Sequence, residues 1–94
     1  MDSFKDINLA FKKKYKDKTI LRVIDYPEEN IYVIQAVPTK RLKEAGQWLD
    51  GMYSMDRASL AIIGGFNPLM HNPDLFFNLP ADRTYRPTAD EVKE

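Results

Sequence analysis

The sequence predicts one small α+β domain, and three observations support this fold class. Two runs rich in β-branched and aromatic residues, 19–26 and 31–37, flank a turn, as in an antiparallel hairpin. An amphipathic segment with helical spacing, 3–16, precedes this hairpin. The length of 94 residues fits one domain with a single modest core. We therefore expect a small antiparallel sheet of two hairpins with about four strands, an N-terminal helix packed on one face and a short C-terminal helix.

The first helix is predicted from the spacing of its apolar residues. Phe4, Ile7 and Phe11 recur at intervals of three and four, which places them on one stripe of a helix. Ser3 is the expected N-cap, with Asp6 three residues later in a pattern that approximates a capping box. The stripe should therefore cover one face of the sheet.

The first hairpin is the predicted centre of the domain. Pro27 presets φ for the start of its turn, and Asn30 tolerates the left-handed region at the end. Both strands carry apolar residues on both faces, so both faces need cover from the chain or from a partner. We expect the N-terminal helix to pack against residues such as Ile24, Val33 and Ile34.

A second hairpin is predicted between residues 47 and 66. A short helix over 40–45 should link the two hairpins. Residues 47–56 form the expected third strand and 60–66 the fourth. A helix over 56–63 is the alternative, because the alanines of this stretch favour helix, whereas its isoleucines and the glycine pair that follows favour strand.

The last part of the chain contains a clear helix-start signal. Asn72 as N-cap and Pro73 at the first helical position predict a short helix over 73–79, whose apolar residues should close one edge of the core. The composition becomes polar after Pro80. We therefore expect a domain over 1–80 and a polar, flexible tail over 81–94.

The charge is balanced overall but uneven along the sequence. The formal net charge is zero, which argues against nucleic-acid binding by the chain as a whole. Lysines gather near the end of the predicted first helix, and the candidate basic patch consists of Lys12, Lys13, Lys16 and Lys18. Cations there complement the negative pole of a helix dipole, which is the structural explanation. A surface for nucleic acid, for anionic lipid or for an acidic partner is the functional explanation.

The residue inventory excludes several chemistries. The chain has no cysteine, so disulfides, thiol catalysis and cysteine-based metal sites are ruled out, and a reducing, cytoplasmic location is expected. His71 is the only histidine, and we expect neither a metal nor a cofactor. No window approaches the roughly 18 uncharged apolar residues of a membrane span, so no membrane association is expected.

The leading functional interpretation is a small, non-catalytic interaction or accessory module that binds another protein or a second copy of itself. Its candidate interaction surface consists of Trp48, Tyr53, Phe66 and His71, because aromatic residues are common interface anchors. The structural alternative places the aromatic residues in the core. Nucleic-acid binding through the basic patch is the second interpretation. A small enzyme with a cleft around Trp48, Asp50, Phe66 and His71 is the third.

Overall fold

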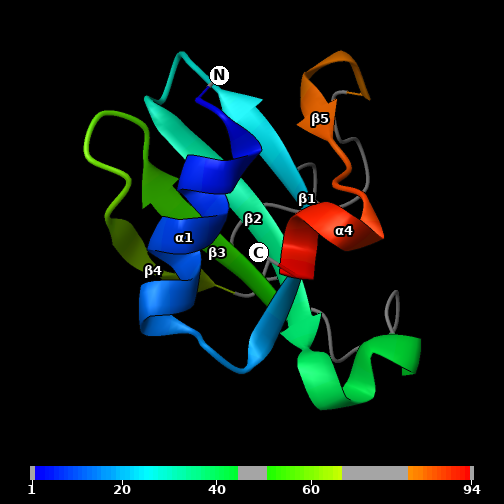
Figure 1. Cartoon of the computed structure of the whole chain (residues 1–94). Coiled ribbons are helices and arrows are strands. Elements are labelled where there is room, and N and C mark those ends of the chain that lie inside the picture. Colours follow the sequence, from blue (N-terminus) through cyan, green and yellow to red (C-terminus); the bar gives the residue numbers. More distant parts are fainter. Residues whose placement is uncertain (1, 45–50, 67–80, 94) are drawn as a thin grey trace.

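The fold is α+β, with an N-terminal helix lying across one face of a five-stranded antiparallel sheet (Figure 1), and it confirms the predicted fold class. The computed structural model describes residues 2–44, 51–66 and 81–93. The strand order is β4-β3-β2-β1-β5. The helices are α1 (Phe4–Lys14) and α4 (Ala89–Lys93), with 3₁₀ helices η1 (Thr39–Glu44) and η2 (Ala81–Arg83). The strands are β1 (Lys18–Tyr26), β2 (Ile31–Pro38), β3 (Gly51–Asp56), β4 (Ile62–Phe66) and β5 (Thr84–Tyr85).

The first hairpin forms as predicted, with β1 and β2 antiparallel along their whole length. Asn30 ends the turn with a positive φ of 58°, and its backbone N–H donates to the Pro27 carbonyl at 3.1 Å. Asparagine tolerates this left-handed conformation better than most residues, because its short polar side chain bonds locally. The roles predicted for Pro27 at the start of the turn and for Asn30 at its end are therefore confirmed.

A β-bulge in β1 changes which of its residues face α1. The register shifts at Leu21, which has no partner in β2. One extra residue moves every later side chain to the opposite face from that of a regular strand. The expectation that Ile24 packs under α1 is therefore wrong, and so is that for Val33, because strand neighbours alternate between faces. Both residues lie in a second cluster with Met52, whereas Ile34 packs with α1 as expected.

The main core lies between α1 and the sheet. The Ser3 side-chain oxygen accepts from the Asp6 backbone N–H at 3.3 Å, which confirms the predicted N-cap. The apolar stripe of α1 packs against β1, β2 and β3. The buried cluster consists of Phe4, Ile7, Phe11, Ile20, Val23, Tyr32, Ile34, Ala36 and Met55.

The second hairpin is confirmed, because β3 and β4 pair as antiparallel strands and the alternative helix over 56–63 does not form. The Asp56 carboxylate caps the turn, where it accepts from the Ser59 backbone N–H at 2.9 Å and from the Ser59 hydroxyl at 2.7 Å. Residues 47–50 of the predicted third strand lie outside the described residues. The predicted linker helix is a 3₁₀ helix, η1, rather than an α-helix.

The residues after 80 form elements that the sequence did not predict. β5 adds to the free edge of β1, with Tyr85 opposite Val23, and α4 then packs beside α1 (Figure 1). Tyr85 and Val92 contact the main core. The predicted helix over 73–79 lies outside the described residues, and the domain boundary at residue 80 stays a prediction.

Candidate functional site

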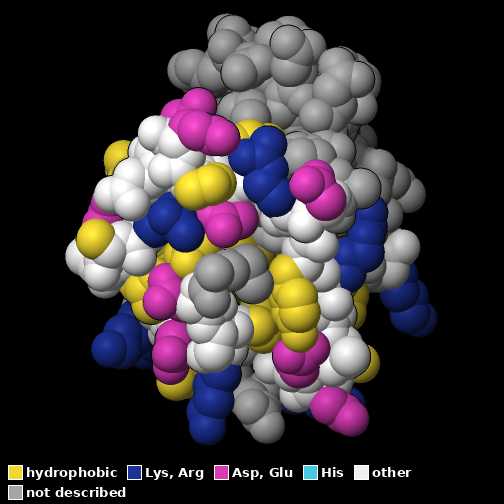
Figure 2. Space-filling view, turned by 90° about the horizontal axis from the view of Figure 1, so that it is seen from above, with side chains coloured by type: hydrophobic (Ala, Val, Ile, Leu, Met, Phe, Trp, Pro, Cys, Tyr) yellow, Lys and Arg dark blue, Asp and Glu magenta, His cyan; other side chains and the backbone are white. Residues whose placement is uncertain are grey.

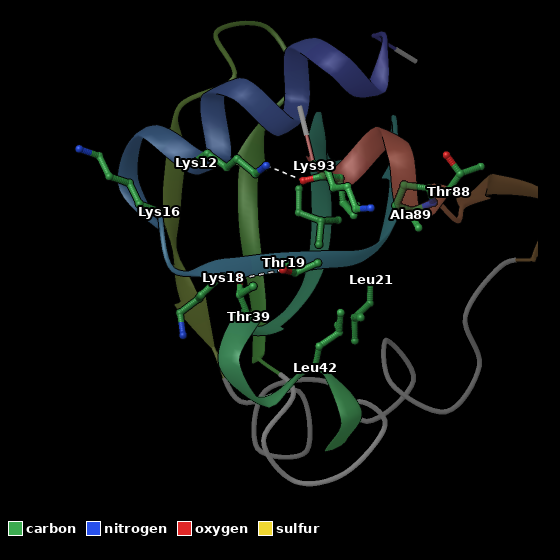
Figure 3. A pocket seen from close by; sticks show the side chains of 13 residues that line it. Lys12, Lys16, Lys18, Thr19, Leu21, Thr39, Leu42, Thr88, Ala89 and Lys93 are labelled. Atoms are coloured by element: carbon green, nitrogen blue, oxygen red, sulfur yellow. Dashed lines mark hydrogen bonds between the residues drawn. The ribbon is translucent and has the colours of Figure 1, made fainter.

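A groove of about 490 Å³ runs along one edge of the sheet, beside β1 (Figure 3). We call it the β1 groove. α1 and α4 lie on one side of it and η1 on the other. Its apolar lining consists of Ile20, Leu21, Leu42, Pro87, Ala89 and Val92. Its polar lining consists of Lys12, Lys16, Lys18, Thr19, Thr39, Thr88 and Lys93.

The groove exists because β5 is short. Among the described strands, β5 alone borders β1 on this side, and it pairs only with Val23 and Ile24. β5 ends at Tyr85, and Pro87, two residues later, has no N–H with which to continue a ladder. Residues 18–21 of β1 therefore line the groove where a longer β5 would have continued.

The N-terminus of α4 is held by a capping box. The Glu91 backbone N–H donates to the Thr88 hydroxyl at 3.2 Å, and the Thr88 N–H donates to the Glu91 carboxylate at 2.9 Å. The Tyr85 hydroxyl donates to the other carboxylate oxygen. The hydrogen bond from Tyr85, and then those from Thr88, lower the pKa of Glu91 below its ordinary value. The ionised carboxylate thus ties α4 to β5.

The C-terminus of α4 is held by α1. The Asn8 side-chain amide donates to the Glu91 carbonyl at 3.3 Å, and the Lys12 ammonium donates to the Val92 carbonyl. These carbonyls have no partner inside so short a helix, so α1 supplies the donors that α4 lacks. The wall of the groove is therefore fixed at both ends.

The opposite side of the groove is joined to β1 by polar contacts. The hydroxyls of Thr19 and Thr39 lie 2.7 Å apart (Figure 3), and the Thr39 backbone N–H donates to the Asp17 carbonyl at 2.8 Å. These bonds place η1 beside β1. Leu42 of η1 remains 43% exposed and points toward Leu21. Leu42 is therefore part of the groove and not of the core.

The structure brings together three residues of the predicted basic patch. Lys12, Lys16 and Lys18 all line the β1 groove, and Lys93 joins them from α4. Lys13 is exposed but is not part of the described lining. The Lys12 ammonium donates to a neutral carbonyl and keeps its charge, so all four lysines contribute to the positive character of the rim. The described lining contains no Asp or Glu.

The opposite end of the molecule differs from the groove in its charge. Figure 2 views the domain from the top of Figure 1, and Lys and Arg side chains are interspersed there with Asp and Glu. Arg57 pairs with Asp25 at 2.8 Å, and Arg83 with Glu28 at 3.3 Å. Positive and negative charges thus lie together at this end, which makes the groove, with lysines and no acidic residue in its described lining, the more distinctive electrostatic feature.

The predicted aromatic interaction surface is described only at Tyr53. The Tyr53 ring lies 5.4 Å from the Phe11 ring in an edge-to-face arrangement and 4.7 Å from the Tyr15 ring. Tyr53 is half-buried and packs against the main core. Trp48 and His71, and the side chain of Phe66, lie outside the described residues. The surface as a whole stays a prediction.

The enzyme interpretation also stays a prediction, because Asp50 lies outside the described residues together with Trp48 and His71. Within the described part of the chain, no group of three or more His, Asp or Glu side chains is placed to hold a metal ion. The described helices include none that is long and apolar enough to cross a membrane.

Comparisons of the chain with protein-family models, with curated proteins and with solved structures found no significant match.

Proposed function

We propose that this protein is a non-catalytic binding module that holds an acidic, partly apolar segment of another protein in the β1 groove. The observation that carries the proposal is the combination of an apolar floor with a lysine rim and no acidic residue in the described lining. Apolar contacts supply most of the free energy of such a complex, and complementary charge supplies specificity and a faster association rate.

The neighbourhood of the groove supports a peptide segment over a nucleic acid. Single-stranded nucleic acids are bound by basic grooves that also offer exposed aromatic rings for stacking. The described lining has no aromatic residue. Tyr15 precedes Lys16 in the sequence, but its ring packs with its centroid 5.2 Å from that of the Phe11 ring. The rim also has lysines and no arginine, whereas arginine is the residue most suited to bidentate phosphate contacts.

We propose a cytoplasmic location for this module. The lack of cysteine supports a reducing compartment, where disulfides are not used for stability. A second copy of this chain is the less favoured partner, because lysines of one rim would meet lysines of the other.

The test is selection of random short peptides on the immobilised protein by display, followed by affinity measurement. We expect enriched sequences that combine Asp or Glu with apolar residues, and binding that weakens as salt is raised. Lys16→Glu should weaken binding of the selected peptides about threefold to fivefold, at the upper end of the scale of exposed ion pairs. Leu42→Ala should weaken them through lost apolar contact.

Lys13→Glu is the matched control, because Lys13 is exposed near the same end of α1 but lies outside the described lining. It should bind the peptides within about twofold of the parent protein, on the scale of an exposed charge. Equal losses in Lys13→Glu and Lys16→Glu would refute the groove as the site. Failure to enrich any peptide would refute the proposed function, and preferential binding of single-stranded oligonucleotides would replace it with nucleic-acid binding.

A further inference from the structure

We infer that the bound segment lies in the β1 groove as an added β-strand, hydrogen-bonded to the backbone of residues 18–21. This inference rests on the proposed function and specifies how the partner is held. It follows from the position of the groove at the edge of the sheet, which its charge and apolarity alone do not determine.

The first argument is the backbone that the groove contains. An edge strand presents N–H and C=O groups that need partners, and an extended peptide satisfies them by adding to the sheet. β5 already does this for Val23 and Ile24, in an antiparallel register. Among the described strands none continues along residues 18–21, which line the groove. Among the described strands, one part of this edge is thus paired within the chain, and the adjoining part is the site that we assign to the ligand.

The second argument is the arrangement of the walls. In Figure 3 the ribbon of β1 crosses the view between the helices on one side and η1 on the other. Side chains of a strand alternate between two faces, so an added strand would point its residues alternately toward the two walls. One wall offers Val92 of α4, and the other offers Leu42 of η1. Both walls have an apolar contact, which fits apolar residues on either side of the added strand.

A helical ligand fits the site less well. A helix satisfies its own backbone groups, so it would cover the edge of β1 without bonding to it, and the edge groups would lose water without compensation. An extended ligand removes the same water and replaces its hydrogen bonds. The groove therefore favours an extended ligand, whose backbone N–H and C=O groups are available to bond to β1.

The bulge at Leu21 and the lysines of the rim determine which kind of strand can pair with the β1 edge. The register shift at Leu21 interrupts the regular edge, so regular pairing is limited to residues 18–20, or roughly 10 Å at 3.3 Å for each residue. Bulges and lysines are also devices by which edge strands avoid pairing with copies of themselves. Two copies paired at this edge would bring their lysine rims close together, whereas an acidic partner would present carboxylates to Lys18. The β1 edge therefore disfavours pairing with a second copy of this chain and favours pairing with an acidic strand of another protein.

The experiment is a scan of backbone N-methylation along a selected peptide. In an added strand, every second N–H faces β1, so methylation at alternate positions should weaken binding about tenfold or more, as expected for losing a hydrogen bond and leaving its acceptor buried. Methylation at the intervening positions, whose N–H groups face away from β1, should leave binding within about twofold by the same argument. Hydrogen exchange should slow in the complex at those amides of residues 19–21 that face away from β2.

The outcomes separate the two claims. Loss of binding in Lys16→Glu without alternation in the methylation scan would refute the added strand and retain the groove as the site. A period of three or four residues would indicate a helical ligand. Binding that ignores Lys16→Glu would refute the proposed function itself, whatever the methylation pattern.

Discussion

The packing of α1 on the sheet can be tested by Phe11→Ala. Phe11 is fully buried, and its ring lies 5.2 Å from that of Tyr15 and 5.4 Å from that of Tyr53. Removing a buried phenylalanine costs about 3–5 kcal/mol, because it loses apolar burial and leaves a cavity. A chain of this length has a total stability of roughly 5–14 kcal/mol. The substitution therefore removes a large share of the free energy of unfolding.

Chemical denaturation and thermal melting measure this loss. At about 4–8 °C for each kcal/mol, the melting temperature should fall by about 12 °C or more. Leu9→Ala is the matched control, since Leu9 is on the same helix but 48% exposed, and it should change stability by about 0.5 kcal/mol or less. If both variants melt alike, α1 does not pack on the sheet as described, and the wall of the β1 groove has no fixed support.

Two further predictions concern the turn of the first hairpin and α4. Asn30→Gly should keep or slightly raise stability, whereas Asn30→Ala should lower it by about 1 kcal/mol, because alanine is strained at the positive φ of 58°; equal urea midpoints would contradict this. The pKa of Glu91 is lowered in the folded protein, so its contribution to stability is present above the ordinary value of 4.5 and is lost as the pH falls through the folded value. Amide signals of α4 should therefore lose dispersion below about pH 4.5 before the rest of the domain unfolds, and Glu91→Ala, which removes both acceptor oxygens, should show this loosening already at neutral pH; signals unchanged in both cases would contradict the capping box.

The sequence was sufficient for the elements that depend on local chemistry. Asn30 and Pro27 identified the first turn, Ser3 identified the start of α1, and the β-branched runs identified both strands. The bulge was not predictable, because the residues on either side of Leu21 are apolar or long enough to lie on either face. Register in such a strand is decided by packing across the sheet, which requires the tertiary structure.

The groove could be predicted only in part, because its two walls come from opposite ends of the chain. The lysines near the end of α1 were identified, but their neighbours in α4 are about 80 residues away, as in the bond between Lys12 and Val92. A signal for α4 was present in the sequence, since Thr88 and Glu91 have the spacing of a capping box. The polar composition around it favoured a tail, and five residues are too few for helical periodicity to show.

The shortness of α4 has a consequence for binding. A helix of five residues is not stable by itself in water, so α4 exists because Thr88 and Tyr85 bind Glu91 at one end and Asn8 and Lys12 bind its carbonyls at the other. Segments held by so few contacts open at a lower free energy than the core. A ligand that contacts Val92 would add to those contacts, so it should slow hydrogen exchange in α4 as well as in β1. Protection confined to β1 would mean that the ligand meets the strand edge but not the helical wall.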